Sequence, residues 1–318
     1  MMKKLPVLLL VVLAALLPLV LDVKYYIHLA VLAMVWAIVA QGANFIQGYT
    51  GYVSIVQGGF MGVGAYASAL LSMRLGLPVW ASLLVAPLLT GAVALVAGYP
   101  SLRVKGHYFA IVTMAYNMVI FIVLINAIDI TGGESGLSRI PVPAGFHLAG
   151  REIDFSNRSH YYYLVLAALV MTSVAAAWLV RSRVGRTWQA TRQNENYAEA
   201  LGISCARYKL AAFIGSALYA GFAGALYAHY VGFINPSPFS VDASMNAILA
   251  VILGGSGTLA GPLVGAGLVV ALPEVLRVAE TFRFIAYGVL LIVAMIFFPR
   301  GLVPMIGGLF RRRRGAGR

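Results

Sequence analysis

The residues of this sequence that could drive transport or catalysis include ten carboxylates, five histidines and one cysteine. No lysine follows a glycine, so the phosphate-binding loop of an ATPase is missing. Carriers driven by protons or sodium usually keep ionisable groups inside the membrane to bind the coupling ion. Here all ten carboxylates are predicted in loops or at helix ends: Asp22, Asp129, Glu134, Glu152, Asp154, Glu195, Glu199, Asp242, Glu274 and Glu280. Driving energy is therefore expected from a partner.

One serine stands in surroundings typical of a nucleophile. Gly254, Gly255, Ser256 and Gly257 match the Gly-x-Ser-Gly pattern of rhomboid-like intramembrane serine proteases, in which a histidine from a later helix acts as the base. All five histidines precede Ser256, so the order is wrong for that alternative. No catalytic residue is predicted. Cys205 is the only cysteine, so neither an internal disulfide nor a cysteine-based metal site is expected.

A polar segment at residues 181–209 has the pattern of a compact docking element. Asn194 is a good helix N-cap, the helix dipole favours Glu195 in the first turn, and Gly202 can adopt the left-handed conformation that ends a helix. Glu199 follows Glu195 at spacing four, a like-charged pair that mildly destabilises a solvated helix. A basic cleft on a partner is expected to recognise the two carboxylates. The alternative is an ordinary solvated loop helix.

Composition places these residues in a polytopic membrane protein. Of 318 residues, 61% are apolar and 10% are charged, and the long apolar runs match a hydrocarbon core of about 30 Å. Because open sheet edges cannot face lipid, the predicted fold is all-α with about 8 to 10 transmembrane helices. Two short apolar runs flank a glycine-rich turn at residues 254–262, and they are expected to form broken or re-entrant helices. The predicted spans are residues 5–21, 25–45, 52–73, 79–99, 108–128, 161–180, 210–232, 243–258, 260–273 and 284–298.

The basic residues predict the orientation of these spans. With a cytoplasmic N-terminus, the inside segments hold sixteen Lys and Arg residues and the outside segments hold seven, so both termini are expected in the cytoplasm. The first apolar run is interpreted as a retained helix and not as a cleaved leader. The basic tail at residues 300–318 is expected to contact anionic membrane lipid, not nucleic acid. Residues 129–160 become an extracytoplasmic loop.

Uncharged polar side chains accompany the spans. Asn44, Gln57, Thr113, Asn117 and Asn246 offer hydrogen bonds without trapping a solute as a fixed charge would. They are candidates for lining the passage of a small polar solute. The alternative is that they hold helices together.

Glycines at spacing four predict close contacts between helices. Gly58 and Gly62 would share one helix face, and Gly257, Gly261 and Gly265 another. Small residues in this arrangement let helix backbones touch within a membrane.

Five ordered stretches carry a family signature, at residues 44–66, 102–113, 131–141, 181–209 and 251–262. Together they resemble the LivM-type permease subunit of bacterial branched-chain amino-acid ABC importers, from about residue 40 to residue 302. The resemblance implies that residues 1–318 form one transmembrane permease domain in the bacterial inner membrane. Its implied partners are a LivH-type permease, two cytoplasmic ATP-binding subunits and a periplasmic amino-acid-binding protein. ATP-Mg would be used by those partner subunits, with no cofactor in this chain.

The same resemblance assigns roles within the polar segment. In the family, the pattern Glu-x-x-x-Glu-Ala-x-Gly-Ile is a coupling helix seated in a groove of the ATPase. The positions that inherit this role are Glu195, Ala198, Glu199, Ala200, Gly202 and Ile203.

The resemblance leaves the solute open. His107 stands where members often have an acidic residue, and close relatives carry urea or short amides instead of branched-chain amino acids. Residues 129–160 are expected either to dock the binding protein or to form a passive cap over the pore.

Overall fold

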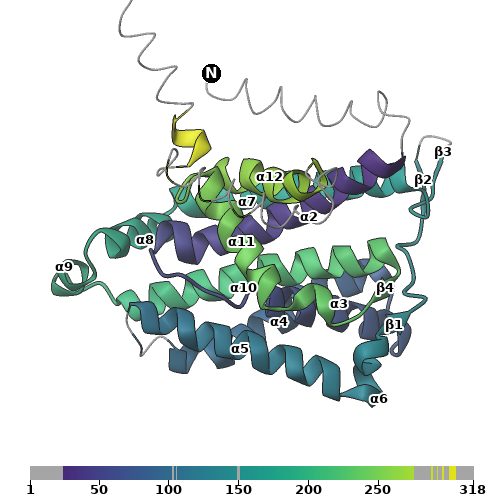
Figure 1. Ribbon diagram of the computed structural model, residues 1–318, viewed down its shortest axis with the longest axis horizontal. Helices are drawn as coiled ribbons and strands as arrows, with labels where there is room; N and C mark the ends of the chain where they lie inside the picture. The colour runs from purple at the N-terminus through teal and green to yellow at the C-terminus, as the bar shows by residue number, and fades with distance from the viewer. Residues whose placement is uncertain are drawn as a thin grey trace, which may run out of the picture.

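The chain is a bundle of long helices (Figure 1). The computed structural model describes residues 24–101, 104, 106–148, 151–275, 288, 292, 296 and 301–305. In that part, the helices of the bundle are α2 (Lys24–Asn44), α3 (Gln57–Met73), α4 (Val79–Ser101), α5 (His107–Asn126), α7 (Arg158–Arg181), α10 (Cys205–Val231), α11 (Val241–Gly254) and α12 (Gly261–Val275). Five of them are long and apolar enough to cross a membrane, namely α2 with the turn that extends it, α4, α5, α7 and α10. The predicted all-α membrane fold is confirmed there.

Short elements join the helices of the bundle. They are the π-helix η1 (Phe45–Tyr49), α6 (Ile128–Thr131), η2 (Gly133–Ser135), β1 (Leu137–Ser138), β2 (Phe146–Leu148), β3 (Arg151–Ile153), α8 (Arg183–Gln193), α9 (Glu195–Ala200), β4 (Phe233–Ile234) and η3 (Ser237–Phe239). β1 pairs antiparallel with β4, and β2 with β3. These strands of two or three residues were not predicted. The predicted span at residues 5–21 lies outside the described residues, and so does most of the one at 284–298.

The connections gather at two opposite ends of the bundle. α8 and α9 project at one end, whereas α6 and the four strands lie at the other (Figure 1). Arg74, after α3, donates hydrogen bonds to the backbone oxygens of Asp129 and Ile130 in α6. Long helices that alternate in direction therefore separate residues 181–209 from residues 129–160.

α10 is the central helix, packed against α2, α3 and α4. A Cβ on Gly64 of α3 would collide with the backbone of Gly221, so α3 and α10 touch backbone to backbone. The rings of Phe60 and Phe213 meet edge to face, with centroids 5.3 Å apart. Because lipid removes the hydrophobic drive between helices, such close van der Waals packing holds a membrane bundle together.

Candidate functional site

The polar segment at residues 181–209 folds as two short helices, α8 and α9. Asn194 caps α9, its side-chain oxygen accepting a hydrogen bond from Tyr197 N at 3.0 Å. Gly202 has a φ of +83°. The predicted N-cap and left-handed helix end are both confirmed, because each depends on residues adjacent in sequence.

The carboxylate of Glu195 is held inside the protein. Its Oε1 accepts a hydrogen bond from Lys209 Nζ at 2.6 Å, and its Oε2 accepts one from the Tyr52 hydroxyl, also at 2.6 Å. Lys209 donates to Tyr52 at 3.0 Å and lies 4.2 Å from the centre of that ring. Burial, and then the hydrogen bond to Glu195, raise the pKa of Tyr52, so its hydroxyl stays a donor.

This network ties α9 to two distant parts of the chain. The Lys209 side chain is 2% exposed and that of Glu195 17%, so the ammonium group is shielded from water and the carboxylate keeps partial access to it. Sequence reasoning assigned Glu195 to a basic cleft on a partner, but it missed Lys209 and Tyr52. We therefore describe Glu195 as a residue that positions α9.

The outer surface of α9 is formed by other residues. Glu199, Ala200 and Gly202 are exposed, Ile203 is half-buried and Ala198 is buried. Two large apolar side chains that the sequence reasoning did not single out also face outward: Tyr197 is 66% exposed and Leu201 65%. Exposed apolar groups around a carboxylate form a surface suited to a protein partner.

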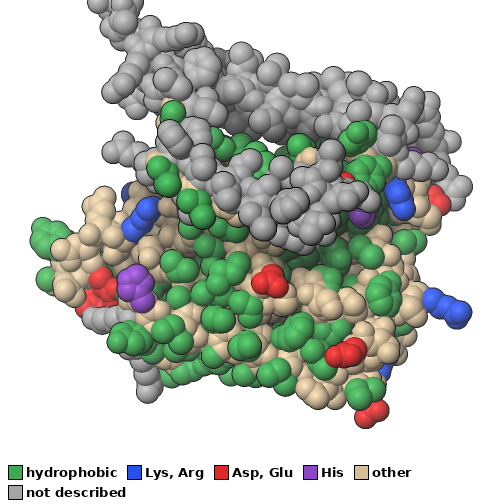
Figure 2. All heavy atoms as spheres, viewed as in Figure 1, with side chains coloured by type: hydrophobic (Ala, Val, Ile, Leu, Met, Phe, Trp, Pro, Cys, Tyr) green, Lys and Arg blue, Asp and Glu red, His purple; other side chains and the backbone are tan. Residues whose placement is uncertain are grey.

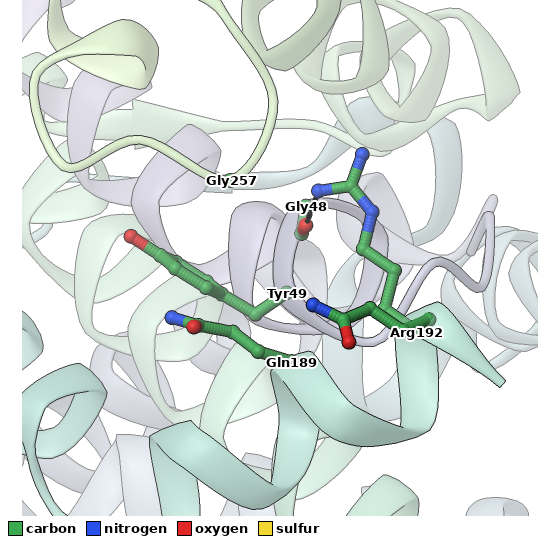
Figure 3. A pocket seen from close by; sticks show the side chains of 6 residues that line it. Gly48, Tyr49, Gln189, Arg192 and Gly257 are labelled. Carbon is green, nitrogen blue, oxygen red and sulfur yellow. Dashed lines mark hydrogen bonds between the residues drawn. The ribbon is translucent and has the colours of Figure 1, made fainter. Parts of the chain in front are cut away.

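A cavity of about 430 Å³ lies where α8 meets the bundle. Figure 3 shows the guanidinium of Arg192 reaching from α8 toward Gly48, with Tyr49 and Gln189 to the left of Arg192. Arg192 donates to the Gly48 carbonyl, and to Ser256 Oγ at 3.3 Å. One side chain of the polar segment at residues 181–209 thus contacts the end of the first described span and the glycine-rich turn. Sequence reasoning did not identify Arg192.

Asn44, at the end of α2, also binds the glycine-rich turn. Its Nδ2 donates to Thr258 O at 2.8 Å, and its Oδ1 accepts from Gly257 N at 2.9 Å. Both polar ends of the side chain bind backbone. The geometry thus gives Asn44, a candidate for the solute passage, a structural role.

The predicted continuous span at residues 52–73 is wrong. Residues 51–56 are not helical, and α3 begins at Gln57. Thr113 accepts a hydrogen bond from Ile55 N at 3.0 Å, and Ser244 accepts one from Gly58 N at 2.8 Å. Side chains from α5 and α11 thus satisfy backbone groups at this interruption, as backbone polar groups within a membrane require.

The interruption runs from the end of the bundle that carries α9 to the start of α3, which lies level with the middle of α5. A helix of 20 residues such as α5 rises about 30 Å, close to the thickness of the hydrocarbon core. Asn117 follows His107 by ten residues and precedes Asn126 by nine. Its Oδ1 accepts from Gly59 N at 2.5 Å and from Ser244 Oγ at 3.1 Å. The N-terminal ends of α3 and α11 therefore meet at mid-depth.

Two polar residues lie near the start of α11. Asp242 is in its first turn, at a helix end as predicted, and its side chain is exposed. Asn246, one turn later, is half-buried. Gln57 is buried and donates to Ser216 Oγ at 3.3 Å. Of the five candidates for the solute passage, Asn246 is the one whose side chain is partly exposed.

The glycines predicted on α3 lie at close contacts. A Cβ on Gly58 would stand 2.5 Å from Ser240 O, and one on Gly62 would stand 3.0 Å from Phe239 Cβ. η3 and the start of α11 therefore lie directly against α3.

The predicted glycine face of Gly257, Gly261 and Gly265 is confirmed for the two glycines of α12 and is wrong for Gly257 in the turn before it. A Cβ on Gly265 would collide with Ala250 O of α11, and one on Gly261 would collide with the backbone of the turn. Gly257 precedes α12 and has a φ of +76°. Its place is set by the turn conformation, so it shares no helix face with Gly261 and Gly265.

Comparison with known proteins identifies the family of this chain. The family described as "Branched-chain amino acid transport system / permease component" matches residues 25–298. The chain belongs to this family. LivM of Escherichia coli (strain K12) is 35% identical to the permease over 308 residues, which cover 91% of this chain and 72% of that protein. LivM of Salmonella typhimurium is 36% identical over 297 residues, with coverages of 88% and 70%.

More distant similarity extends to the LivH branch of the family. LivH of E. coli (strain K12) is 26% identical to the permease over 290 residues, covering 86% of this chain and 92% of that protein. No solved structure matches. The permease is a multi-pass membrane subunit of an ABC transport system and not an enzyme, so the serine-protease alternative is wrong. In the structure, Ser256 Oγ accepts a hydrogen bond from Arg192.

Proposed function

We propose that this permease forms half of the translocation pathway of an importer for branched-chain amino acids. Its sister subunit would be a LivH-type permease, as the similarity to both LivM and LivH supports. Two cytoplasmic ATP-binding subunits would supply energy from ATP-Mg, and a periplasmic amino-acid-binding protein would deliver the solute.

The α9 surface is the observation that supports coupling to the ATPases. Glu199, Tyr197 and Leu201 project from a short capped helix, and an internal ion pair fixes the direction of that helix. A rigid projection of this kind transmits force between proteins better than a mobile loop. α9 is thus assigned to a groove of the ATPase, with Ala198, Ala200, Gly202 and Ile203 shaping its fit.

The orientation follows from this assignment. With α9 in the cytoplasm, the opposite end of the bundle, with α6 and the strands, faces the periplasm (Figure 1). Both termini would then be cytoplasmic, in agreement with the distribution of basic residues. Residues 129–160 dock the binding protein, and the tail at residues 300–318 contacts anionic lipid.

Reconstitution in proteoliposomes tests this function. The permease with its sister subunit, both ATPases and the binding protein should take up leucine, isoleucine or valine when ATP is supplied on the cytoplasmic side. The permease alone should hydrolyse no ATP and take up no solute under a proton gradient. Uptake of urea or acetamide without the three amino acids would replace the proposed solute, and uptake by the lone chain would replace the proposed class. An autoinducer 2 import permease of Yersinia pestis is similar to 54% of this chain. Autoinducer 2 is therefore a useful further solute to test.

A further inference from the structure

The first turn of α11 places a carboxylate on an apolar face at membrane depth. Ser244 of this turn contacts Asn117 at the middle of α5, so Asp242 lies near the same depth. One turn along α11, Met245 is exposed, and Met118, next to Asn117 on α5, is exposed too. Figure 2 shows an acidic group within the hydrophobic surface, well away from both ends of the molecule.

Lipid is an unfavourable environment for this carboxylate. A charged side chain at the bilayer centre costs at least about 2.5–3.5 kcal/mol, and such groups almost always face a protein interior or a water-filled cavity. The N-terminal end of α11 lowers part of this cost by favouring a negative charge in its first turn. Asp242 therefore faces either the sister subunit or the aqueous pathway between the two permeases.

Two buried polar atoms at the same depth favour the pathway. Asn117 Nδ2 and Gln57 Oε1 are fully buried, and neither has a hydrogen-bond partner in the described part of the chain. Both belong to the junction where α3 begins. Unpaired buried polar groups are costly in a purely structural core, and they are found where a solute or water binds.

The interrupted backbone supports the same interpretation. Residues 51–56 run without helical structure from the end of the bundle that carries α9, where Tyr52 contacts Glu195, to Gln57 at the junction. Irregular backbone at membrane depth occurs where it is buried in protein or lines a cavity. Substrate sites of other membrane transporters lie at the midplane between broken helices, whose positive N-terminal ends attract anionic groups.

We propose that the junction of α3 and α11 is a site for an α-amino acid, in which the Asp242 carboxylate binds the ammonium group. Asn246 adds an amide one turn along α11, and Met245 adds apolar surface for the side chain. The inference rests on the proposed importer function and names the group that recognises its solute.

Charge-retaining and charge-removing variants test the site in the complete complex. Asp242→Asn should lower leucine uptake in proteoliposomes on the order of tenfold or more, because a hydrogen bond between two charged groups is lost. Asp242→Glu, which keeps the charge, should retain most of the uptake. Both complexes should assemble normally. Uptake at the wild-type rate by a fully assembled Asp242→Asn complex would overturn the proposal.

Cysteine accessibility separates the pathway from the contact between permeases. In a Cys205→Ala background, Asp242→Cys should react with the water-soluble cation methanethiosulfonate-ethyltrimethylammonium, and leucine with the binding protein and ATP should slow the reaction. Leu88→Cys is the control, because Leu88 is 64% exposed near the middle of α4 and should stay unreactive. An unreactive Asp242→Cys in the assembled complex would assign this residue to the sister-subunit contact and refute the site. If the wild-type complex carries none of the branched-chain amino acids, the proposed function fails independently of Asp242.

Discussion

Removing both members of the Glu195–Lys209 pair should loosen α9 by less than the sum of removing each one alone. Breaking a buried ion pair costs about 3–5 kcal/mol, but Glu195 keeps 17% exposure and a glutamine still accepts one hydrogen bond. We therefore expect Glu195→Gln to destabilise the local fold of residues 181–209 by about 2–3 kcal/mol. Lys209→Met should cost about 1–2 kcal/mol, because the Glu195 carboxylate keeps Tyr52 and reaches water. The double variant should cost less than the sum by about 1–2 kcal/mol.

Amide hydrogen exchange of the complex in nanodiscs measures this effect. Exchange from α9 reports its local opening, and a loss of about 2–3 kcal/mol corresponds to exchange roughly 30- to 150-fold faster. Substrate-stimulated ATP hydrolysis should fall in parallel, since a loosened α9 transmits less force. Glu199→Gln is the matched control, because its exposed carboxylate should leave exchange unchanged while weakening co-purification with the ATPase. Strictly additive effects of the two single variants would refute an energetic link between Glu195 and Lys209.

Three further predictions use matched positions within the chain. Gly202→Val should destabilise the fold by about 1–2 kcal/mol through backbone strain alone, because φ is positive and nothing lies within 4 Å of a Cβ. This variant should reduce ATPase association. Gly76→Val, which is strained in the same way at the opposite end of the bundle, should not. Gly265→Ala should destabilise the α11–α12 contact by about 1–3 kcal/mol in thermal unfolding, whereas Gly267→Ala, with no neighbour within 4 Å, should be neutral. Asn44→Leu should cost about 2–4 kcal/mol and reduce assembly, since two backbone hydrogen bonds are lost; normal assembly with reduced transport would instead assign Asn44 to the solute passage.

The sequence alone determined the class of the protein and its local structure. Long apolar runs predicted the spans, because a helix pairs its backbone groups internally and needs only length and composition to cross lipid. The cap at Asn194 and the left-handed turn at Gly202 also followed from adjacent residues. Ordered motifs along the chain indicated the permease family, which the comparison established.

The tertiary structure decided what depends on residues far apart in sequence. The Glu195 carboxylate looked free for a partner until the fold brought Tyr52, 143 positions away, into hydrogen-bond contact with it. Likewise, α3 begins late because Thr113 and Ser244, on other helices, satisfy the backbone N–H groups of Ile55 before its start and Gly58 just after it. The depth of Asp242 depends on how the chain descends before α11, and no local pattern records that path. The sequence placed the carboxylate at the edge of a predicted span, and only packing against α5 showed that this helix end lies level with the middle of α5.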